Sequence, residues 1–236
     1  MRSDSMRRLM AAAILLGACA AGGRAGKPAA QCFPLDSLRG LEMHNIKGEV
    51  AEYRGRRAVR LVQDANTNAI VSMNMAESIA ILDGTDFQNG TIEAELAGMP
   101  AAGSPADSRG FLGVAFRVAG HGEKFECFYL RPTNGRADDQ LRRNHALQYI
   151  SYPDFPWYKL RKENPGQYES YADMGSGEWT RIRIEVQGVK ARLYVNGAAQ
   201  PALIVNDLKL GESHGKIALW TTTDTDGYFS NLTVKE

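Results

Sequence analysis

From Phe87 onward, apolar and polar residues alternate along the chain with a period of two. In the segment 112–118 one set consists of leucine, valine and phenylalanine, and the intervening set consists of glycine, alanine and arginine. The same alternation returns in 127–131, 181–186 and 192–196. Because successive side chains of a strand point to opposite faces of a sheet, this pattern predicts half-buried antiparallel strands.

Turn sequences separate these segments at the spacing expected of a sandwich or barrel. Asn-Gly or Asp-Gly pairs, whose residues tolerate positive φ, begin at Asn89, Asn134, Asn196 and Asp226. We count roughly a dozen strands, and only Ala76–Leu82 also fits a short helix. The sequence contains no βαβ alternation, no Gly-rich phosphate loop and no internal repeat. It therefore predicts one all-β domain, a β-sandwich with a long functional loop.

The long loop is predicted over Tyr149–Tyr171, which holds seven of the 20 Phe, Trp and Tyr residues of the chain. Three prolines in this stretch exclude a regular strand or helix interior. Rigid aromatic side chains bury area at little entropic cost, and sugars present C–H faces that stack on such rings. The alternative is a small core in which the rings pack beneath the loop. Binding is the favoured interpretation for Trp157 and Tyr158 alone.

Composition and charge exclude several classes of function. Hydrophobic residues make up 44% and charged residues 23% of the 236 residues, which is typical of a globular protein. The formal net charge is +1, so neither a field for nucleic acid nor a polybasic tail is present. The four histidines are isolated in the sequence, which argues against a zinc site.

The N-terminus has the features of an export signal. Two arginines precede the apolar segment 9–18, which is too short to span a bilayer and predicts a signal peptide over 1–18. The run LGAC at 16–19 resembles a bacterial lipobox, in which Cys19 becomes the lipidated first residue. Cleavage at another small residue nearby is the alternative.

We therefore expect a lipidated tether over 19–31 and one folded domain over 32–236. The lipid would be the only contact with a membrane, and we expect a periplasmic or cell-surface lipoprotein anchored in the outer membrane. Two further cysteines, Cys32 and Cys127, either form a disulfide in an oxidising compartment or remain free thiols.

A candidate binding face follows from the segment 112–118. Its small residues Gly113 and Ala115 leave room on one sheet face for a ligand or for a covering loop. Neighbouring strands would add hydrogen-bond donors and stacking surface to this face. The residues predicted to line the groove are Arg117, Tyr129, Arg131, Gln148, Tyr152, Trp157 and Tyr158. The alternative is that the arginines pair with acidic residues on a wet sheet face.

Several runs of residues resemble concanavalin A-like lectin/glucanase domains. They are RGFLGVAFR, FECFYLRPTNGRADDQ, QYISYPDFPWYKLR, EWTRIRIEV and GKIALWTTTDTDGYFSNLTV, and the similarity extends over 87–234. The chain is most similar in type to the laminin-G-like and 3-keto-disaccharide hydrolase-like jelly rolls of exported bacterial proteins. The resemblance implies two stacked, curved antiparallel sheets, with the predicted groove on a concave, carbohydrate-facing surface.

The resemblance leaves activity open, because this fold carries lectins, glycosidases and adhesion modules. The E-x-D-x-x-E pattern of laminarinase-type members is absent, and Glu93-Ala94-Glu95 lies in a predicted edge strand. No pair of carboxyls is nominated for ordinary glycoside hydrolysis. A 3-keto sugar needs only one base and one oxyanion or metal partner for elimination. The candidate bases are Glu126, Glu169 and Asp173.

Many members of this fold hold a structural calcium ion, which is the one cofactor that the resemblance implies. Asp224 and Asp226 offer oxygen ligands for it, and a plain turn is the alternative. Three hypotheses of function result: a saccharide-binding module, an enzyme that cleaves the glycosidic bond of a 3-keto disaccharide or glycoside, and a laminin-G-like protein-interaction module. The first is favoured, because an aromatic loop is present and a paired-acid motif is absent.

Overall fold

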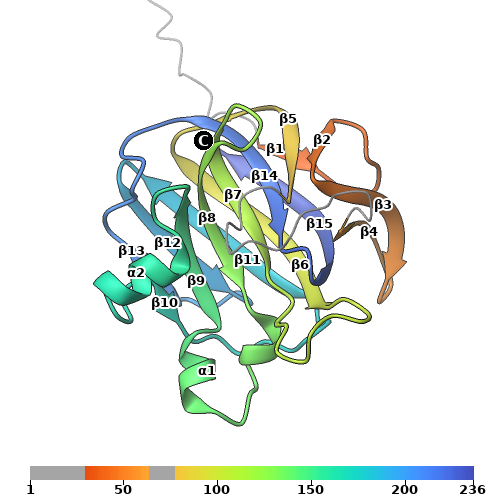
Figure 1. Cartoon of the computed structure of the whole chain (residues 1–236). Helices are drawn as coiled ribbons and strands as arrows, with labels where there is room; N and C mark the ends of the chain where they lie inside the picture. Colours follow the sequence, from red (N-terminus) through yellow and green to blue (C-terminus); the bar gives the residue numbers. More distant parts are fainter. Residues whose placement is uncertain (1–29, 64–77) are drawn as a thin grey trace, which may run out of the picture.

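The computed structural model describes residues 30–63 and 78–236 of the chain. These residues form two antiparallel β-sheets, of eight and seven strands, that stack on each other (Figure 1). The prediction of an all-β sandwich is confirmed. The predicted signal peptide over 1–18 and Cys19 lie outside the described residues. Of the ambiguous segment 76–82, the described part leads into a strand.

The eight-stranded sheet consists of β1 (Gln31–Phe33), β3 (Ile46–Tyr53), β4 (Arg56–Gln63), β6 (Gly90–Pro100), β11 (Thr180–Gln187), β12 (Lys190–Val195), β13 (Leu203–Val205) and β15 (Thr225–Lys235). Its order is β13-β12-β11-β6-β15-β4-β3, and β1 pairs with β15. Strand β6 therefore lies in the middle of the sheet, between β11 and β15. The prediction of an edge strand around Glu93 and Glu95 is wrong, because the acidic side chains only mark its solvent face.

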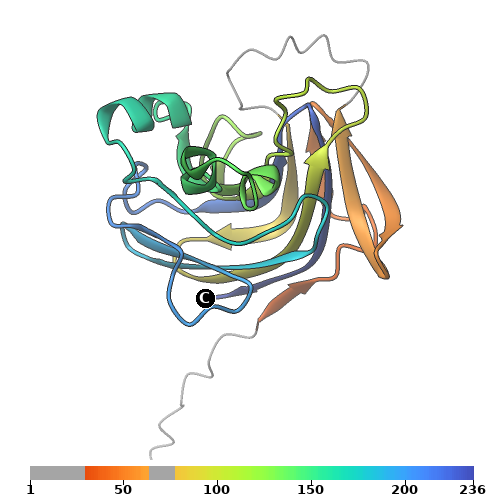
Figure 2. The ribbon, with the colours of Figure 1, turned by 90° about the horizontal axis from the view of Figure 1, so that it is seen from below.

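The seven-stranded sheet consists of β2 (Leu41–His44), β5 (Ile79–Phe87), β7 (Leu112–Ala119), β8 (Lys124–Leu130), β9 (Leu147–Tyr152), β10 (Glu169–Ser170) and β14 (Gly215–Thr221). Its order is β10-β9-β8-β7-β14-β5-β2. Both sheets are curved, and the outer face of the seven-stranded sheet is on the hollow side (Figure 2). The outer face of the seven-stranded sheet is therefore concave, whereas that of the eight-stranded sheet is convex.

The hydrophobic core lies between the sheets and follows the alternation of the sequence. In β11 the isoleucines and the valine are buried, and the intervening polar residues are exposed or half-buried. In β7 and β8, by contrast, almost every side chain is buried, so these strands are covered on both faces. The prediction of half-buried strands therefore holds for the eight-stranded sheet and fails at the centre of the seven-stranded one.

The aromatic stretch 149–171 is only partly a loop. It completes β9, continues through the helix α2 (Trp157–Glu163) and returns to the sheet as β10. Pro156 is the residue that caps the helix N-terminus, a position where its missing N–H costs nothing. The prediction of a continuous loop is wrong, because the prolines lie at the ends of a helix rather than inside it. A second short helix, α1 (Gln140–Asn144), lies near it in front of the same sheet (Figure 2).

Two of the four predicted turns are wrong. Asn196 and Gly197 have φ values of 51° and 75°, as a tight hairpin turn requires, and Gly90 at 133° follows the β5–β6 turn. Asn134, however, ends a 3-10 helix over Pro132–Asn134. Asp226 lies inside β15, because its neighbours on both sides continue the sheet pairing.

The two cysteines of the domain are free thiols. Cys32 is exposed in β1, whereas Cys127 is buried in β8, which belongs to the other sheet. Burial raises the pKa of the Cys127 thiol. Among the residues that the structure describes, no helix is long and apolar enough to cross a membrane.

Arg117 does not join the predicted groove. A bulge after Phe116 interrupts the pairing of β7, and Arg117 adopts a φ of 54° there. Its buried guanidinium donates to the backbone carbonyls of Gln88 at 2.8 Å, Gly188 at 2.8 Å and Gly211 at 2.6 Å. Arg117 therefore ties three connections together at one end of the sandwich. The alternation placed it with Gly113 on one face, and the bulge redirects it.

Replacing Arg117 with Met should destabilise the protein by about 3 kcal/mol, because three buried carbonyls lose a charged donor. The free energy of unfolding, measured by chemical denaturation, checks this. The control is Arg39→Met, at an exposed position outside this network, which should change stability by less than about 0.5 kcal/mol. Equal effects of the two substitutions would contradict the structural role of Arg117.

Candidate functional site

The sheet pairing places seven residues in one row across the outer face of the seven-stranded sheet, because directly paired residues share a face. From β2 to β10 the row consists of His44, Ile79, Trp220, Gly113, Tyr129, Gln148 and Glu169. Gly113, in the middle of the row, lets the backbones of β7 and β8 approach each other closely, since a Cβ at this position would lie 2.1 Å from the carbonyl oxygen of Phe128. The two ends of this row carry the polar groups of interest.

At the β10 end, the buried guanidinium of Arg131 is the centre of a hydrogen-bond network. It donates to the hydroxyl of Tyr129 at 2.9 Å and to Oε1 of Gln148 at 3.0 Å. It also donates to the carbonyl of His145 at 2.9 Å and to Oε1 of Glu169 at 3.3 Å. Burial raises the pKa of Tyr129 to about 12, so the phenol stays protonated. The structure thus brings three of the predicted groove residues together.

Glu169 is the buried counter-ion of this network. Its side chain is 2% exposed, and its carboxylate pairs with Arg131 and with Arg161, whose Nε lies 2.9 Å from Oε2. The imidazole Nε2 of His145 lies 3.5 Å from the same oxygen. One carboxylate therefore faces two guanidinium groups and an imidazole, and its charge-assisted hydrogen bonds fix the positions of the two arginine side chains.

Positive charge exceeds negative charge around Glu169. We call Arg109, Arg131, Arg142 and Arg161 the arginine cluster. Burial lowers the pKa of Arg109, and the other three guanidinium groups lower it further, against a smaller opposing effect of Asp107. Arg109 makes no hydrogen bond or ion pair with a described residue. The Nε of Arg142 is buried without a hydrogen-bond partner. The cluster therefore has unused donors and mutual repulsion.

Aromatic rings border the arginine cluster. Trp157, the first residue of α2, is half-buried, and the guanidinium of Arg161 one turn later lies 4.7 Å from its ring centre. The ring of Phe111 lies 5.2 Å from the Arg131 guanidinium. Tyr158 is exposed and meets Trp157 edge to face. Tyr152 instead stacks on Phe125 within the sheet, with ring centres 5.3 Å apart.

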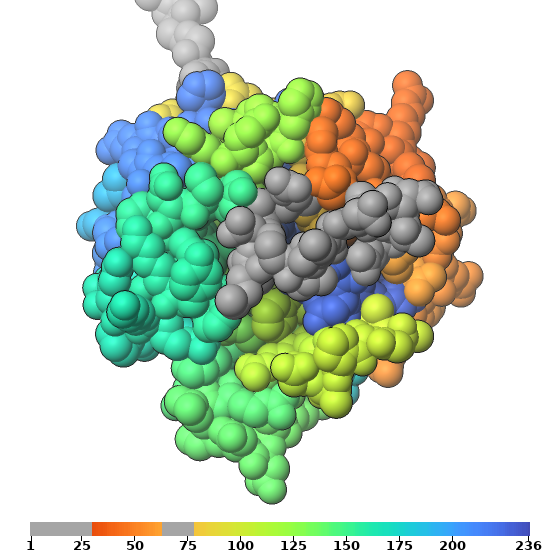
Figure 3. Space-filling model, viewed as in Figure 1, coloured from red at the N-terminus to blue at the C-terminus, as the bar shows by residue number. Residues whose placement is uncertain are grey.

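The arginine cluster is drawn from connections as well as strands. Arg109 precedes β7, Arg142 belongs to α1, and Arg161 belongs to α2. In Figure 3 the surface is hollowed between the segment near residue 105 and the segment near residue 160. The strands therefore supply the floor of the site, and the connections supply its rim.

His145 is a site residue that the sequence analysis missed. It lies between α1 and β9, and its side chain is partly exposed. Burial lowers its pKa, the arginines lower it further, and Glu169 opposes them. The imidazole is therefore neutral at neutral pH. The sequence offers no signal for this role, because the residue stands alone in a polar connection.

Two of the predicted bases lie away from the arginine cluster. Glu126 points into the sandwich, where it accepts the Tyr149 hydroxyl at 2.5 Å and the Leu210 amide at 2.7 Å. Asp173 is exposed and pairs with Arg136 at 2.8 Å, which lowers the pKa of that carboxyl. Of the three predicted bases, only Glu169 contacts the arginine cluster. The catalytic roles of all three stay predictions.

The candidate metal ligands also differ from those predicted. Both carboxylate oxygens of Asp226 accept from Arg60, at 2.7 and 2.9 Å, and the backbone carbonyl of Asp224 accepts from Ala101. Calcium binding at these two residues stays a prediction. Among residues 30–63 and 78–236, the side chains that converge as ligands are Glu42, His44 and His121.

No protein-family model matches the chain, and no curated protein matches it. Solved structures do match. A Bacillus subtilis protein of unknown function with a galectin-like fold aligns with a TM-score of 0.58 and 12% identity, over 89% of this chain and 96% of that one. Carbohydrate-binding module CBM66 from Bacillus subtilis aligns with a TM-score of 0.52 and 13% identity, over 83% and 98%.

The β-glucanase of Bacillus licheniformis aligns with a TM-score of 0.51 and 12% identity, over 89% of this chain and 99% of that one. The chain has the concanavalin A-like lectin/glucanase fold. At these identities the likeness shows the fold alone. The fold that the sequence runs implied is therefore confirmed, and the function has to be argued from the site.

Glu126 should make stability depend on pH. Burial raises the pKa of this carboxyl above its usual 4.5, and the hydrogen bonds from Tyr149 and Leu210 oppose the rise only in part. The folded chain then holds a proton that the unfolded chain has released, so the free energy of unfolding falls as pH rises between the two pKa values. In Glu126→Gln this decline should be missing.

Chemical denaturation from acid to neutral pH measures the difference between the wild-type and variant curves. The exposed Glu163→Gln serves as the control and should run parallel to the wild type. Parallel curves for Glu126→Gln as well would show that Glu126 titrates normally in the fold.

Proposed function

We propose that this protein is a saccharide-binding domain whose arginine cluster selects an acidic saccharide, one that carries carboxylate or sulfate groups. The observation that carries the proposal is the charge imbalance around Glu169. Two guanidinium groups pair with this buried carboxylate, and Arg109, which both of these and the guanidinium of Arg142 repel, lacks a hydrogen-bonding partner among the described residues. An anionic ligand would relieve this repulsion, whereas a neutral sugar would not.

The geometry of arginine supports an oxyanion as the ligand group. A guanidinium presents its donors in a planar fork that matches carboxylate and sulfate oxygens. Hydrogen bonds between charged partners contribute about 1.5–3 kcal/mol each when they are shielded from water. Arg109, which is half-buried and has no hydrogen-bond partner among the described residues, is the donor that such a group would engage. The two terminal nitrogens of Arg131 already make four hydrogen bonds within the protein, so this side chain would hold the floor of the site.

The aromatic rim supports a saccharide as the carrier of that charge. Trp157 is half-buried beside Arg161, and Tyr158 next to it is exposed. A sugar ring can stack its C–H face on such a ring while its acidic group reaches the arginines. The fold adds weight, because a carbohydrate-binding module and a β-glucanase share it.

Replacing Arg109 with Met or Trp157 with Ala should weaken binding of an acidic oligosaccharide about tenfold or more, a loss of about 1.4 kcal/mol. The ligand panel would contain oligouronates, sulfated oligosaccharides and their neutral counterparts, and calorimetry would give the Kd. Binding should weaken with salt. Arg39→Met, an exposed arginine outside the cluster, is the matched control and should bind like the wild type.

Several outcomes would overturn the proposal. Equal affinity for the acidic and neutral oligosaccharides would remove the role of charge. Unchanged affinity in both site variants would place binding elsewhere. Binding of none of the panel, together with saturable binding of a protein partner that Trp157→Ala abolishes, would favour an interaction module.

A second candidate function is cleavage of the acidic saccharide by elimination, and His145 favours it. Its imidazole is neutral, is held by Glu169 and lies among the arginines. A uronate carboxylate neutralised by Arg109 would acidify the adjacent C5–H bond. The imidazole nitrogen that does not face Glu169 would take that proton, the C4–O bond would break, and a C4–C5 double bond would form. The departing oxygen would take a proton from water.

His145→Gln separates the two functions. If the protein is a lyase, the wild type should release products with a new double bond, detected by absorbance and mass spectrometry. The variant should then lose turnover while it keeps the affinity of the wild type for the oligouronate. If the wild type binds oligouronates and releases no unsaturated product, elimination is wrong and binding stands alone.

A further inference from the structure

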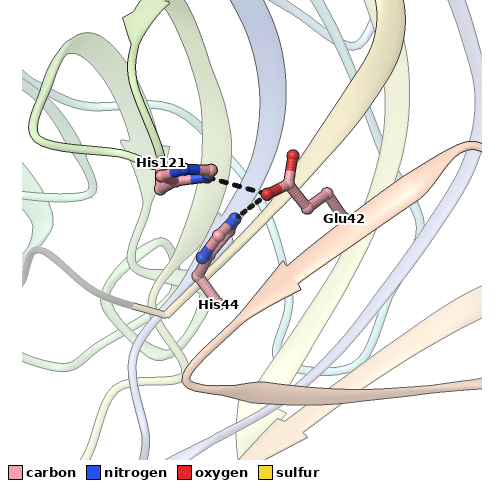
Figure 4. A group of neighbouring side chains, drawn as sticks. All are labelled: Glu42, His44 and His121. Carbon is pink, nitrogen blue, oxygen red and sulfur yellow. Dashed lines mark hydrogen bonds and ion pairs between the residues drawn. The ribbon is translucent and has the colours of Figure 1, made fainter.

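Three potential metal ligands converge at the β2 end of the same sheet face (Figure 4). Oε1 of Glu42 lies 3.0 Å from Nε2 of His44 and 2.8 Å from Nδ1 of His121. The two imidazole centres are 5.1 Å apart, and the ligand atoms of all three side chains lie within 4.8 Å of one another. One carboxylate oxygen thus sits between two ring nitrogens, and both rings point toward it.

The fold assembles this group from two distant segments. Glu42 and His44 are two residues apart in β2, so they share one face, while Met43 packs toward the core. His121 comes from the turn between β7 and β8. Gly122 in that turn has a φ of 104°, and a Cβ there would lie 3.2 Å from Ile79. The turn therefore bends over β5 and reaches β2.

We propose that Glu42, His44 and His121 form a binding site for a divalent transition-metal ion of the zinc type. Two imidazoles and one carboxylate are a ligand set that zinc accepts, with a further position left for water. The hydrogen bonds to Glu42 hold the three groups together without the ion, so little rearrangement is required. Binding would replace these hydrogen bonds, and each imidazole would bind the ion through a ring nitrogen that carries no proton.

The surroundings set the accessibility and strength of the site. The side chains of His121, Glu42 and His44 are 70%, 36% and 23% exposed, so an ion can enter from solvent. Lys216 lies 3.7 Å from Oε2 of Glu42, on the oxygen that does not face the histidines. Its charge is shared with Asp83 at 3.8 Å. We therefore expect modest affinity rather than a tightly held structural ion.

This site is separate from the arginine cluster. His44 and Glu169 occupy the two ends of one row that crosses seven strands. Six strand spacings of about 4.8 Å put them roughly 29 Å apart along the sheet. The inference therefore stands whether or not the cluster binds a saccharide.

Zinc chloride titration of the purified protein, followed by calorimetry, tests the site. The protein would lack a histidine tag and carry Cys32→Ser, because the exposed Cys32 thiol is another zinc ligand. We expect saturable binding of one ion per chain. His44→Ala and His121→Ala should each weaken it more than roughly tenfold. Affinity should also fall as the pH is lowered, because protons compete with the ion for the ligand nitrogens.

The matched control is His214→Ala. His214 is an exposed histidine that pairs with Asp86 at 2.6 Å, without a second histidine, so this variant should bind zinc like the wild type. Since His121 lies on an exposed turn, its variant should keep the melting temperature of the wild type measured without zinc. No saturable binding, or an equal loss in His214→Ala, would overturn the proposal. A cobalt absorption spectrum that persists in His121→Ala would do so too.

Discussion

The buried ion pair between Arg131 and Glu169 is the interaction on which the candidate site depends. Taking both charges out of water is costly, and only a full set of partners offsets that cost. The partners come from β8, β9 and the segment after α1: Tyr129, Gln148 and the carbonyl of His145. Satisfying one guanidinium therefore fixes the edge of the seven-stranded sheet and the start of its rim. The other arginines of the cluster therefore gather near a carboxylate, that of Glu169, which is already paired with Arg131.

The bulge after Phe116 in β7 redirects one of the predicted groove residues. It turns Arg117 away from the outer face and into the end of the sandwich, where the side chain holds three connections. It also lies at the base of the turn that carries His121 over β5 toward β2. One local irregularity in the pairing thus removes an arginine from the predicted groove.

Alternation predicted the part of the site that lies on strands. Tyr129, Arg131 and Gln148 were placed together because neighbouring strands bring same-face residues side by side, and the structure has them hydrogen-bonded. The same reasoning failed for Arg117, because a bulge shifts the face on which a side chain points. It could not find Arg109 or His145, which lie in connections where no period exists. The helix α2 was missed because its flanking prolines suggested an irregular loop.

The sequence alone determined the all-β class and the two-sheet sandwich. Strands with one apolar face form a sheet with one apolar face, and a second sheet is the usual way to bury it. The sequence also indicated where aromatic residues gather. Only the tertiary structure decided which charges meet. Arg109, Arg142 and Arg161 lie far apart in the chain, as do Glu42 and His121, and each pairing depends on how connections fold over the sheet. Connections carry no repeating pattern, so their contacts follow from packing and charge in three dimensions.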